Sequence, residues 1–216
     1  MCTSMECVRS TKDCESFGEV ILGEVKNMEL KGLKTEFLGR NVMFFQSIDS
    51  TQIKVKSLRQ PLDGTIVIAD NQVSAVGTHD RKWYTGNGQN IAMSFVLFPA
   101  CPIKNIENIT ICIAKCMVEI VQKLYGIKLE IKKPNDLYFQ NKKVGGILTE
   151  TVCKGEMVKK MYIGIGMNIN QEKFPGNLSE IATSLKIEGK KEFDRERIIV
   201  EFLNKFEKEY RKMIKS

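Results

Sequence analysis

The chain has 216 residues, 43% of them hydrophobic, and its 33 basic and 26 acidic side chains give a formal net charge of +7. This length and composition allow one substantial core and indicate one principal domain. With no run of about eighteen apolar residues and no apolar signal core near the N-terminus, we expect neither a membrane-spanning helix nor a secretory signal.

The seven cysteines are odd in number and irregularly spaced, unlike the dense, even-numbered patterns of disulfide-framed secreted domains. We therefore expect a reducing, cytoplasmic setting. Cys112 and Cys116 have a spacing that would suit metal ligands, but the single histidine and the lack of a second nearby pair favour buried thiols. Basic residues are scattered without an arginine-rich run among aromatics, which favours a lysine-rich solvated surface over a nucleic-acid-binding face.

The first predicted elements lead to a long loop. Residues 1–18 lack hydrophobic periodicity and are predicted to be a flexible leader. A strand is predicted over 41–48, followed by a helix-start signature at 49–51. A second strand over 64–69 enters the polar loop 70–90, and loops of this length in compact domains are usually functional or disordered.

The second half of the chain alternates strands with two amphipathic helices. A strand is predicted over 91–98, and a helix over 106–125 that Gly126 stops. Asp194 caps a final helix with a continuous apolar stripe. Between these helices lie short β-rich stretches at 128–132, 137–140, 146–150 and 158–169. Strands grouped around a middle helix, without βαβ alternation or repeats, predict an α+β domain built on a mixed sheet.

Four separated segments form an ordered set of motifs. They are Asp49-Ser50-Thr51-Gln52; the loop with Gln72, Gly77, Arg81 and Trp83; Lys132-Lys133-Pro134-Asn135-Asp136-Leu137-Tyr138 with Lys143-Val144-Gly145-Gly146-Ile147-Leu148; and Gly164-Ile165-Gly166-Met167-Asn168-Ile169. In order and spacing they resemble the motifs of the biotin–protein ligase family, over roughly residues 40–210. The resemblance implies the biotin/lipoate ligase catalytic fold, a mixed, largely antiparallel sheet packed with helices and similar to class II aminoacyl-tRNA synthetases.

The resemblance also implies an activity and its partners. Enzymes of this family form biotinyl-5'-AMP from biotin and ATP, with Mg²⁺ as the accompanying ion, and transfer biotin to a lysine of a biotin carboxyl carrier domain of a biotin-dependent carboxylase. Residues 19–216 are then expected to form the catalytic domain, without an N-terminal DNA-binding domain or a small C-terminal β-barrel. We accordingly expect no DNA or membrane partner, whereas the edge-strand dimerisation of relatives leaves a homodimer open.

Joining a carboxylate to ATP brings two anions together and requires fixed positive charge. Lys143 and Arg81 are the predicted catalytic residues. A turn lysine is more often simply solvated, but the adjacent Gly145 and Gly146 let the backbone approach a ligand closely and favour the functional interpretation. The predicted biotin-binding residues are Ser50, Thr51, Gln52, Gln72, Gly77, Trp83, Lys143, Gly145 and Gly146.

Each assigned polar residue also has a structural interpretation. A buried ureido ring requires partners for one carbonyl and two N–H groups, which Ser50, Thr51 and Gln72 suit, although the first two also fit a helix N-cap. Asn135 and Asp136 also fit an Asx turn. The resemblance implies that Asp136 binds Mg²⁺ and that the nucleotide is bound by Arg81, Trp83, Asn135 and Asn168.

The 70–90 loop departs from the family pattern. Residues 75–83 read AVGTHDRKW where the family usually has G-R-G-R-R-G-R-x-W, so that Gly77, Arg81 and Trp83 remain. The reduced positive charge predicts faster release of biotinyl-adenylate than in relatives with the intact loop. Two other interpretations stay open: a lipoate or octanoate ligase, which shares the fold and reaction type, and a non-catalytic biotin-binding module.

Overall fold

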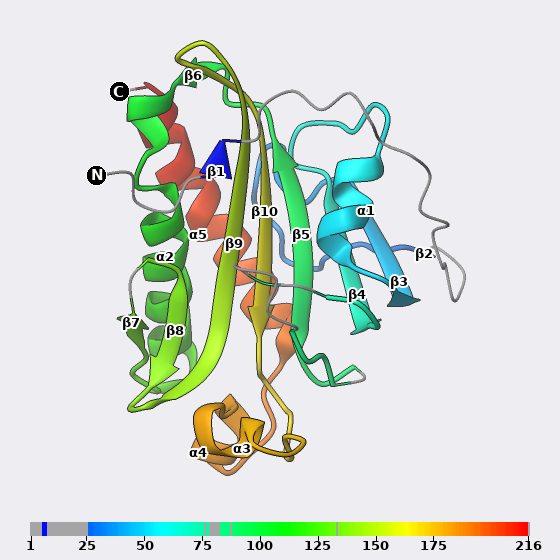
Figure 1. Ribbon diagram of the computed structural model, residues 1–216, viewed down its shortest axis with the longest axis vertical. Helices are drawn as coiled ribbons and strands as arrows, with labels where there is room; N and C mark the ends of the chain where they lie inside the picture. Colours follow the sequence, from blue (N-terminus) through cyan, green and yellow to red (C-terminus); the bar gives the residue numbers. More distant parts are fainter. Residues whose placement is uncertain are drawn as a thin grey trace.

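The computed structural model describes residues 6–7, 26–75, 77, 83–86, 88–132 and 134–215. Within these residues ten strands form one sheet, with two long helices on one face and a short helix on the other (Figure 1). The strands are β1 (Glu6–Cys7), β2 (Lys26–Asn27), β3 (Val42–Ile48), β4 (Ile66–Gln72), β5 (Ile91–Leu97), β6 (Cys101–Pro102), β7 (Glu130–Lys132), β8 (Asp136–Phe139), β9 (Lys142–Lys154) and β10 (Met157–Met167). The helices are α1 (Thr51–Ser57), the 3-10 turn η2 (Ile103–Ile106), α2 (Ile109–Tyr125), α3 (Leu178–Ile181), α4 (Leu185–Gly189) and α5 (Arg195–Lys215).

The sheet is mixed and largely antiparallel, which confirms the predicted fold class. Its order is β2-β3-β4-β5-β10-β9-β8-β7, with β1 beside β9 and β6 beside β10. Among the described strands, β3 pairs with β4 in parallel and β1 with β9 in parallel, and the other pairs are antiparallel.

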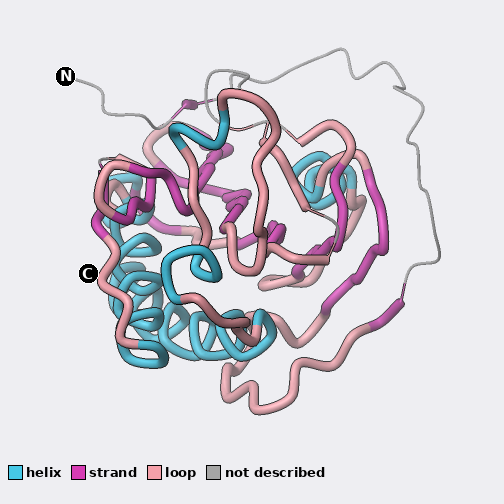
Figure 2. Tube along the Cα trace, turned by 90° about the horizontal axis from the view of Figure 1, so that it is seen from below, coloured by secondary structure: helices cyan, strands magenta, loops and turns pink. Residues whose placement is uncertain are grey.

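The two faces of the sheet carry cores of different size. Alternate residues of β5, such as Met93 and Phe95, join a large cluster under α2 and α5, whereas Val96 joins a small cluster under α1. On α5, the rings of Phe202 and Phe206 stack with centroids 5.5 Å apart. Seen from below in Figure 2, the long helices α2 and α5 lie together on one side of the strands, and the short helix α1 lies away from them. The thin layer on the α1 side leaves part of that sheet face uncovered by helices.

A buried carboxylate docks α5 against the turn that precedes β3. Glu207 is 4% exposed, and its Oε1 accepts a hydrogen bond from Glu36 N at 2.7 Å. Its Oε2 accepts from Phe37 N at 3.2 Å and from Leu38 N at 2.8 Å. The last helix of the chain is thus held to one of the first described segments.

The second half of the sheet is longer than the sequence indicated. The β-rich stretch predicted at 146–150 is the middle of β9, which pairs with β10 in a long hairpin. The hairpin turns at Gly155, whose φ of 60° is the left-handed conformation that glycine adopts readily. The helix predicted over 106–125 begins as η2 and continues as α2, and it ends at Gly126 as predicted, with φ 73°. Helices α3 and α4 were not predicted.

The described residues include only part of the predicted leader and of the predicted domain. Two residues of the segment 1–18 form β1, and the rest of that segment lies outside the described residues. The limits 19–216 therefore stay a prediction. Within the described part of the chain, no helix is both long enough and apolar enough to cross a membrane.

Candidate functional site

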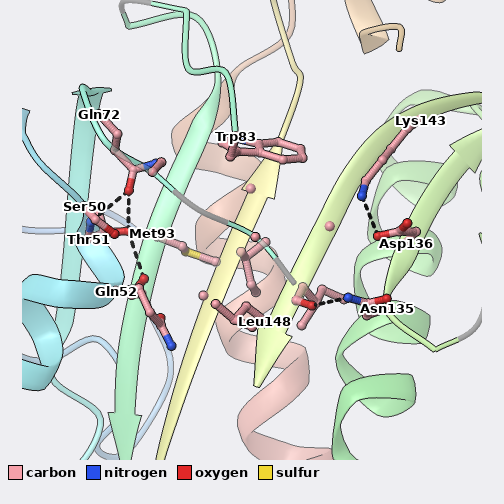
Figure 3. Close-up of a pocket in the computed structure, with 18 residues that line it drawn as sticks. Ser50, Thr51, Gln52, Gln72, Trp83, Met93, Asn135, Asp136, Lys143 and Leu148 are labelled. Atoms are coloured by element: carbon pink, nitrogen blue, oxygen red, sulfur yellow. Dashed lines mark hydrogen bonds and ion pairs between the residues drawn. The ribbon is translucent and has the colours of Figure 1, made fainter. Parts of the chain in front are cut away.

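A pocket lies on the α1 face of the sheet, between α1 and the β8–β9 hairpin (Figure 3). The space between its lining residues, part of which is open to solvent, is about 520 Å³. Ten of the residues predicted from the sequence line it: Ser50, Thr51, Gln52, Gln72, Gly77, Trp83, Asn135, Asp136, Lys143 and Gly146. The motifs that are separated in the sequence are thus brought together around one cavity.

The floor of the pocket is a patch of sheet with little side-chain bulk. Gly164 of β10 pairs with Ser94 of β5 and with Leu148 of β9, and these residues line the pocket. In the next row Gly166 pairs with Gly146. The residues that alternate with these glycines on β10 carry large apolar side chains into the core below. Sequence reasoning missed Ser94 and Gly164 as pocket residues; the alternation of isoleucine and glycine in β10 could have indicated Gly164, whereas no local pattern indicates Ser94.

One end of the pocket is a network of hydroxyl and amide groups. The N–H and Oγ1 of Thr51 both donate to Gln72 Oε1, at 2.8 and 3.0 Å, and Thr51 Oγ1 is 2.9 Å from Ser94 Oγ. Ser50 Oγ accepts from Ile53 N at 3.4 Å, so Ser50 caps α1 as its alternative interpretation predicted. This end offers both donors and acceptors to a polar ring.

Trp83 packs against the glycine floor. A Cβ at Gly166 would lie 2.5 Å from Cε2 of Trp83, so only glycine allows the indole this position. The backbone N–H of Trp83 donates to Ala75 O at 2.8 Å and closes the base of the loop between them. Trp83 Nε1 is buried and has no hydrogen-bond partner among the described residues.

The opposite end of the pocket is charged. Lys143 Nζ lies 2.7 Å from Asp136 Oδ1 and 5.8 Å from the centroid of the Trp83 ring. Asn135 is fixed beside them, because its side-chain Nδ2 donates to Ile147 O at 3.0 Å and its backbone carbonyl accepts from Ile147 N. The pocket therefore joins an uncharged polar end to an end that holds an ion pair, across a glycine floor.

The carboxylate at this end does not form a metal centre by itself. Within the described residues, no three histidine, cysteine, aspartate or glutamate side chains gather to hold a metal ion. Asp136 is a single carboxylate and forms an ion pair with Lys143. The assignment of Asp136 as a Mg²⁺ ligand stays a prediction, and a single carboxylate suits it, because Mg²⁺ is commonly bound through one or two carboxylates together with phosphate and water.

Three predicted residues are not seen to line the pocket. Asn168 is 4% exposed, and its Nδ2 donates to Thr183 O at 3.0 Å, so its amide fastens the chain after β10 instead. Gly145 faces away from the cavity, where a Cβ would lie 3.0 Å from Gly166 O. Arg81 lies outside the described residues, as does most of the altered loop.

The loop that carries Trp83 is braced from α5. Arg195 Nη2 donates to Asp70 Oδ1 at 3.0 Å, and Arg195 Nη1 donates to Asn90 O at 2.9 Å. Gly88 N also donates to Asp70 O at 2.9 Å. The two ends of the 70–90 segment are thus tied to the first turn of the final helix.

Comparisons with known proteins identify the family of the chain. Residues 44–168, more than half of the chain, match the Biotin/lipoate A/B protein ligase family. The Bifunctional ligase/repressor BirA of Bacillus spizizenii is 37% identical over 194 residues, covering 88% of this chain and 60% of that protein. A Biotin–[acetyl-CoA-carboxylase] ligase of Paracoccus denitrificans is 31% identical over 124 residues, covering 56% of this chain and 51% of that protein.

A solved structure shares the same fold. It is a biotin protein ligase from Aquifex aeolicus in complex with biotin and ATP, with a TM-score of 0.72 and 29% identity, covering 82% of this chain and 73% of the other. This chain spans 60% of the length of the Bacillus relative. The extent of the family match and the agreement of the fold lead to one conclusion: the chain belongs to the biotin/lipoate A/B protein ligase family.

Proposed function

We propose that this chain is an ATP-dependent biotin–protein ligase, which forms biotinyl-5'-AMP and then biotinylates a lysine. One observation carries the proposal: a single pocket has hydroxyl and amide groups at one end and Lys143 at the other. Biotin has a matching arrangement, because its bicyclic urea is polar and uncharged and its tail ends in a carboxylate. The names of the Bacillus and Paracoccus relatives, and the biotin and ATP in the Aquifex aeolicus structure, support this assignment.

At the polar end we assign the ureido ring to Ser50, Thr51 and Gln72. A buried urea must exchange its hydrogen bonds with water for hydrogen bonds with protein, or binding suffers the desolvation cost. In the ligand-free arrangement Thr51 and Gln72 bond to each other, so the network is already oriented before the ring arrives. Trp83 would cover the bound ring system, and Gly77 and Gly146 allow backbone close to it.

In the first half-reaction a carboxylate oxygen of biotin attacks the α-phosphorus of ATP. A new P–O bond forms, the bond to the β-phosphate bridge breaks, and pyrophosphate leaves. No enzyme nucleophile is needed, so catalysis is positioning and charge neutralisation. We assign the neutralisation to Lys143, which would exchange its bond to Asp136 for one to the α-phosphate, and to Arg81. Asn135 and Trp83 are proposed to contact the nucleotide.

The Mg²⁺ that accompanies ATP would be held by the phosphates and water, with Asp136 as its proposed protein ligand. In the second half-reaction the neutral amine of an acceptor lysine attacks the adenylate carbonyl, an amide bond forms, the C–O bond to AMP breaks, and the nitrogen loses a proton. We propose a carrier domain of a biotin-dependent carboxylase as the acceptor, because the Paracoccus relative is named for acetyl-CoA carboxylase. We also propose a cytoplasmic setting, in keeping with Cys101 and Cys116, which are thiols.

Exchange of labelled pyrophosphate into ATP tests the proposal. We expect exchange that requires biotin and that neither lipoate nor octanoate supports. Exchange driven by lipoate or octanoate would assign the chain to the related acyl ligases of the family. Biotin binding without exchange would instead identify a non-catalytic biotin-binding module and overturn the proposal.

A further inference from the structure

The glycine floor of the pocket ends at a row of larger residues. Tyr162 of β10 pairs with Val96 of β5 and with Glu150 of β9, one row along from Gly164 and on the same face of the sheet. Glu150 therefore lies at the margin of the cavity that Gly164 and Leu148 line. Neither Glu150 nor Tyr162 was identified as a site residue from the sequence.

Gln52 reaches from α1 to this row. It is 7% exposed, and its Nε2 donates to Glu150 Oε2 at 2.7 Å and to Tyr162 O at 3.4 Å. Both partners are acceptors without a hydrogen to donate, so only the NH₂ group of the amide can face them. A flipped amide would place its oxygen against a carboxylate. The two acceptors therefore fix which way the Gln52 amide points.

The other end of the amide faces the pocket. Gln52 Oε1 is buried and has no hydrogen-bond partner among the residues that the structure describes. It lies over the floor, because a Cβ at Gly164 would be 2.8 Å from it, and both residues line the cavity. A buried carbonyl oxygen without a partner is unfavourable, and a ligand N–H placed at this point would remove the penalty.

Glu150 is itself held in place. Its second oxygen, Oε1, is 2.8 Å from Lys56 Nζ on α1. Burial raises the pKa of the Tyr162 phenol, and the nearby Glu150 charge raises it further. The carboxylate thus bridges two residues of α1 and leaves neither oxygen free to rotate toward the cavity.

We propose that Glu150 is a positioning residue that orients the Gln52 amide, and that Gln52 Oε1 accepts a hydrogen bond from a ureido N–H of biotin. The proposal rests on the proposed function and adds a specificity determinant to it. A cyclic urea presents two N–H groups, whereas a dithiolane ring or a hydrocarbon chain presents none. A site with an oriented acceptor selects against ligands that leave this acceptor unpaired.

Titration calorimetry with biotin on the full chain tests the proposal. Glu150→Met removes the acceptor that orients the amide, and Gln52→Met removes the amide, so we expect each to raise the Kd for biotin about tenfold. Glu150→Gln keeps an acceptor oxygen without the charge and is expected to raise the Kd about twofold to threefold, because the amide then samples both orientations. Lys56→Met is the matched control, since it breaks the outer ion pair and leaves the bond to Gln52, and its Kd should stay within about twofold of the unmodified chain.

Two readouts separate this role from a merely structural one. Biotin methylated at each ureido nitrogen in turn should bind the unmodified chain with a penalty that is larger for one isomer, and Gln52→Met should remove that difference. In the ligand-free protein, the side-chain NH₂ resonances of Gln52 should shift in Glu150→Met and stay unchanged in Lys56→Met.

The outcomes are distinguishable from failure of the proposed function. If the unmodified chain binds biotin and supports pyrophosphate exchange, but Gln52→Met and Glu150→Met bind biotin within twofold of it, only the role of this pair is overturned. An unchanged preference between the methylated isomers in Gln52→Met would have the same meaning. If the unmodified chain binds no biotin, the proposed function fails and the role of Gln52 fails with it.

Discussion

Replacing Gly166 by alanine tests whether the indole of Trp83 depends on the bare floor of the pocket. The added Cβ would lie 2.5 Å from Cε2 and 2.8 Å from Cζ2 and Nε1 of Trp83. Carbon atoms in ordinary contact are about 3.5–4.0 Å apart, so the ring must move by roughly 1 Å or the strand must bend. Forced overpacking of this kind costs about 1–3 kcal/mol, and we expect the free energy of unfolding to fall by that amount.

A double-mutant cycle isolates the contact. In Trp83→Ala the ring is absent, so adding Gly166→Ala should cost less than about 0.5 kcal/mol in urea unfolding. Gly146→Ala is a matched control on the neighbouring strand, because its Cβ would meet Asp136 Oδ1 and Lys143 Cε at 3.4 Å, which is ordinary contact. The same displacement of the ring should lower kcat/KM for biotin-dependent pyrophosphate exchange by about tenfold.

Additive effects in the double-mutant cycle would contradict a clash between the added Cβ and the Trp83 ring. If Gly166→Ala costs as much in the Trp83→Ala background as in the unmodified chain, so that the two effects on unfolding simply add, the clash is not with the ring. A loss in Gly146→Ala equal to that in Gly166→Ala would likewise point to a general effect of alanine on these strands.

Three further predictions concern the charged end, the loop and the last helix. Lys143→Met should lower kcat/KM for pyrophosphate exchange by about 100-fold or more, because the charge that meets the α-phosphate is lost, while urea unfolding changes little; near-normal exchange would remove Lys143 from the mechanism. Biotinyl-adenylate should leave this enzyme faster than relatives with the arginine-rich loop, which trapping and timing free adenylate would measure, and equal retention would contradict the role given to loop charge. Glu207→Gln keeps one acceptor for the backbone amides of residues 36–38 and should lower the free energy of unfolding by about 1–3 kcal/mol in urea titration, whereas no change would mean that water replaces the lost bonds.

Much of the fold follows from local patterns in the sequence. The high β-propensity of 41–48 predicts β3, and the apolar stripe of the last helix predicts α5. Strand β9 was predicted too short, because its length is set by cross-strand pairing and its glycines weaken the local signal, whereas β10 was predicted almost in full. The short helices α3 and α4 depend on tertiary contacts that no short stretch of sequence encodes.

The site was predictable where motifs are contiguous and not where it is assembled by strand register. Ser50, Thr51 and Gln72 were identified because they stand in or near motifs, and they do line the pocket. Ser94 carries no motif and joins the site only because β5 pairs with β10. Asn168 continues the spacing of the β10 glycines but does not line the pocket, because β10 ends at Met167 and the Asn168 amide bonds to Thr183 O.

The bracing by α5 has a consequence for synthesis of the protein. Every residue that lines the pocket precedes α5 in the chain, yet Arg195 ties both ends of the 70–90 segment and Glu207 fastens the turn before β3. While α5 is still inside the ribosome, the nascent chain already contains every residue that lines the pocket. It still lacks the Arg195 hydrogen bonds that hold the two ends of the segment carrying Trp83. Competence to capture substrate should therefore arise only after α5 has left the ribosome, and not gradually as the motifs emerge.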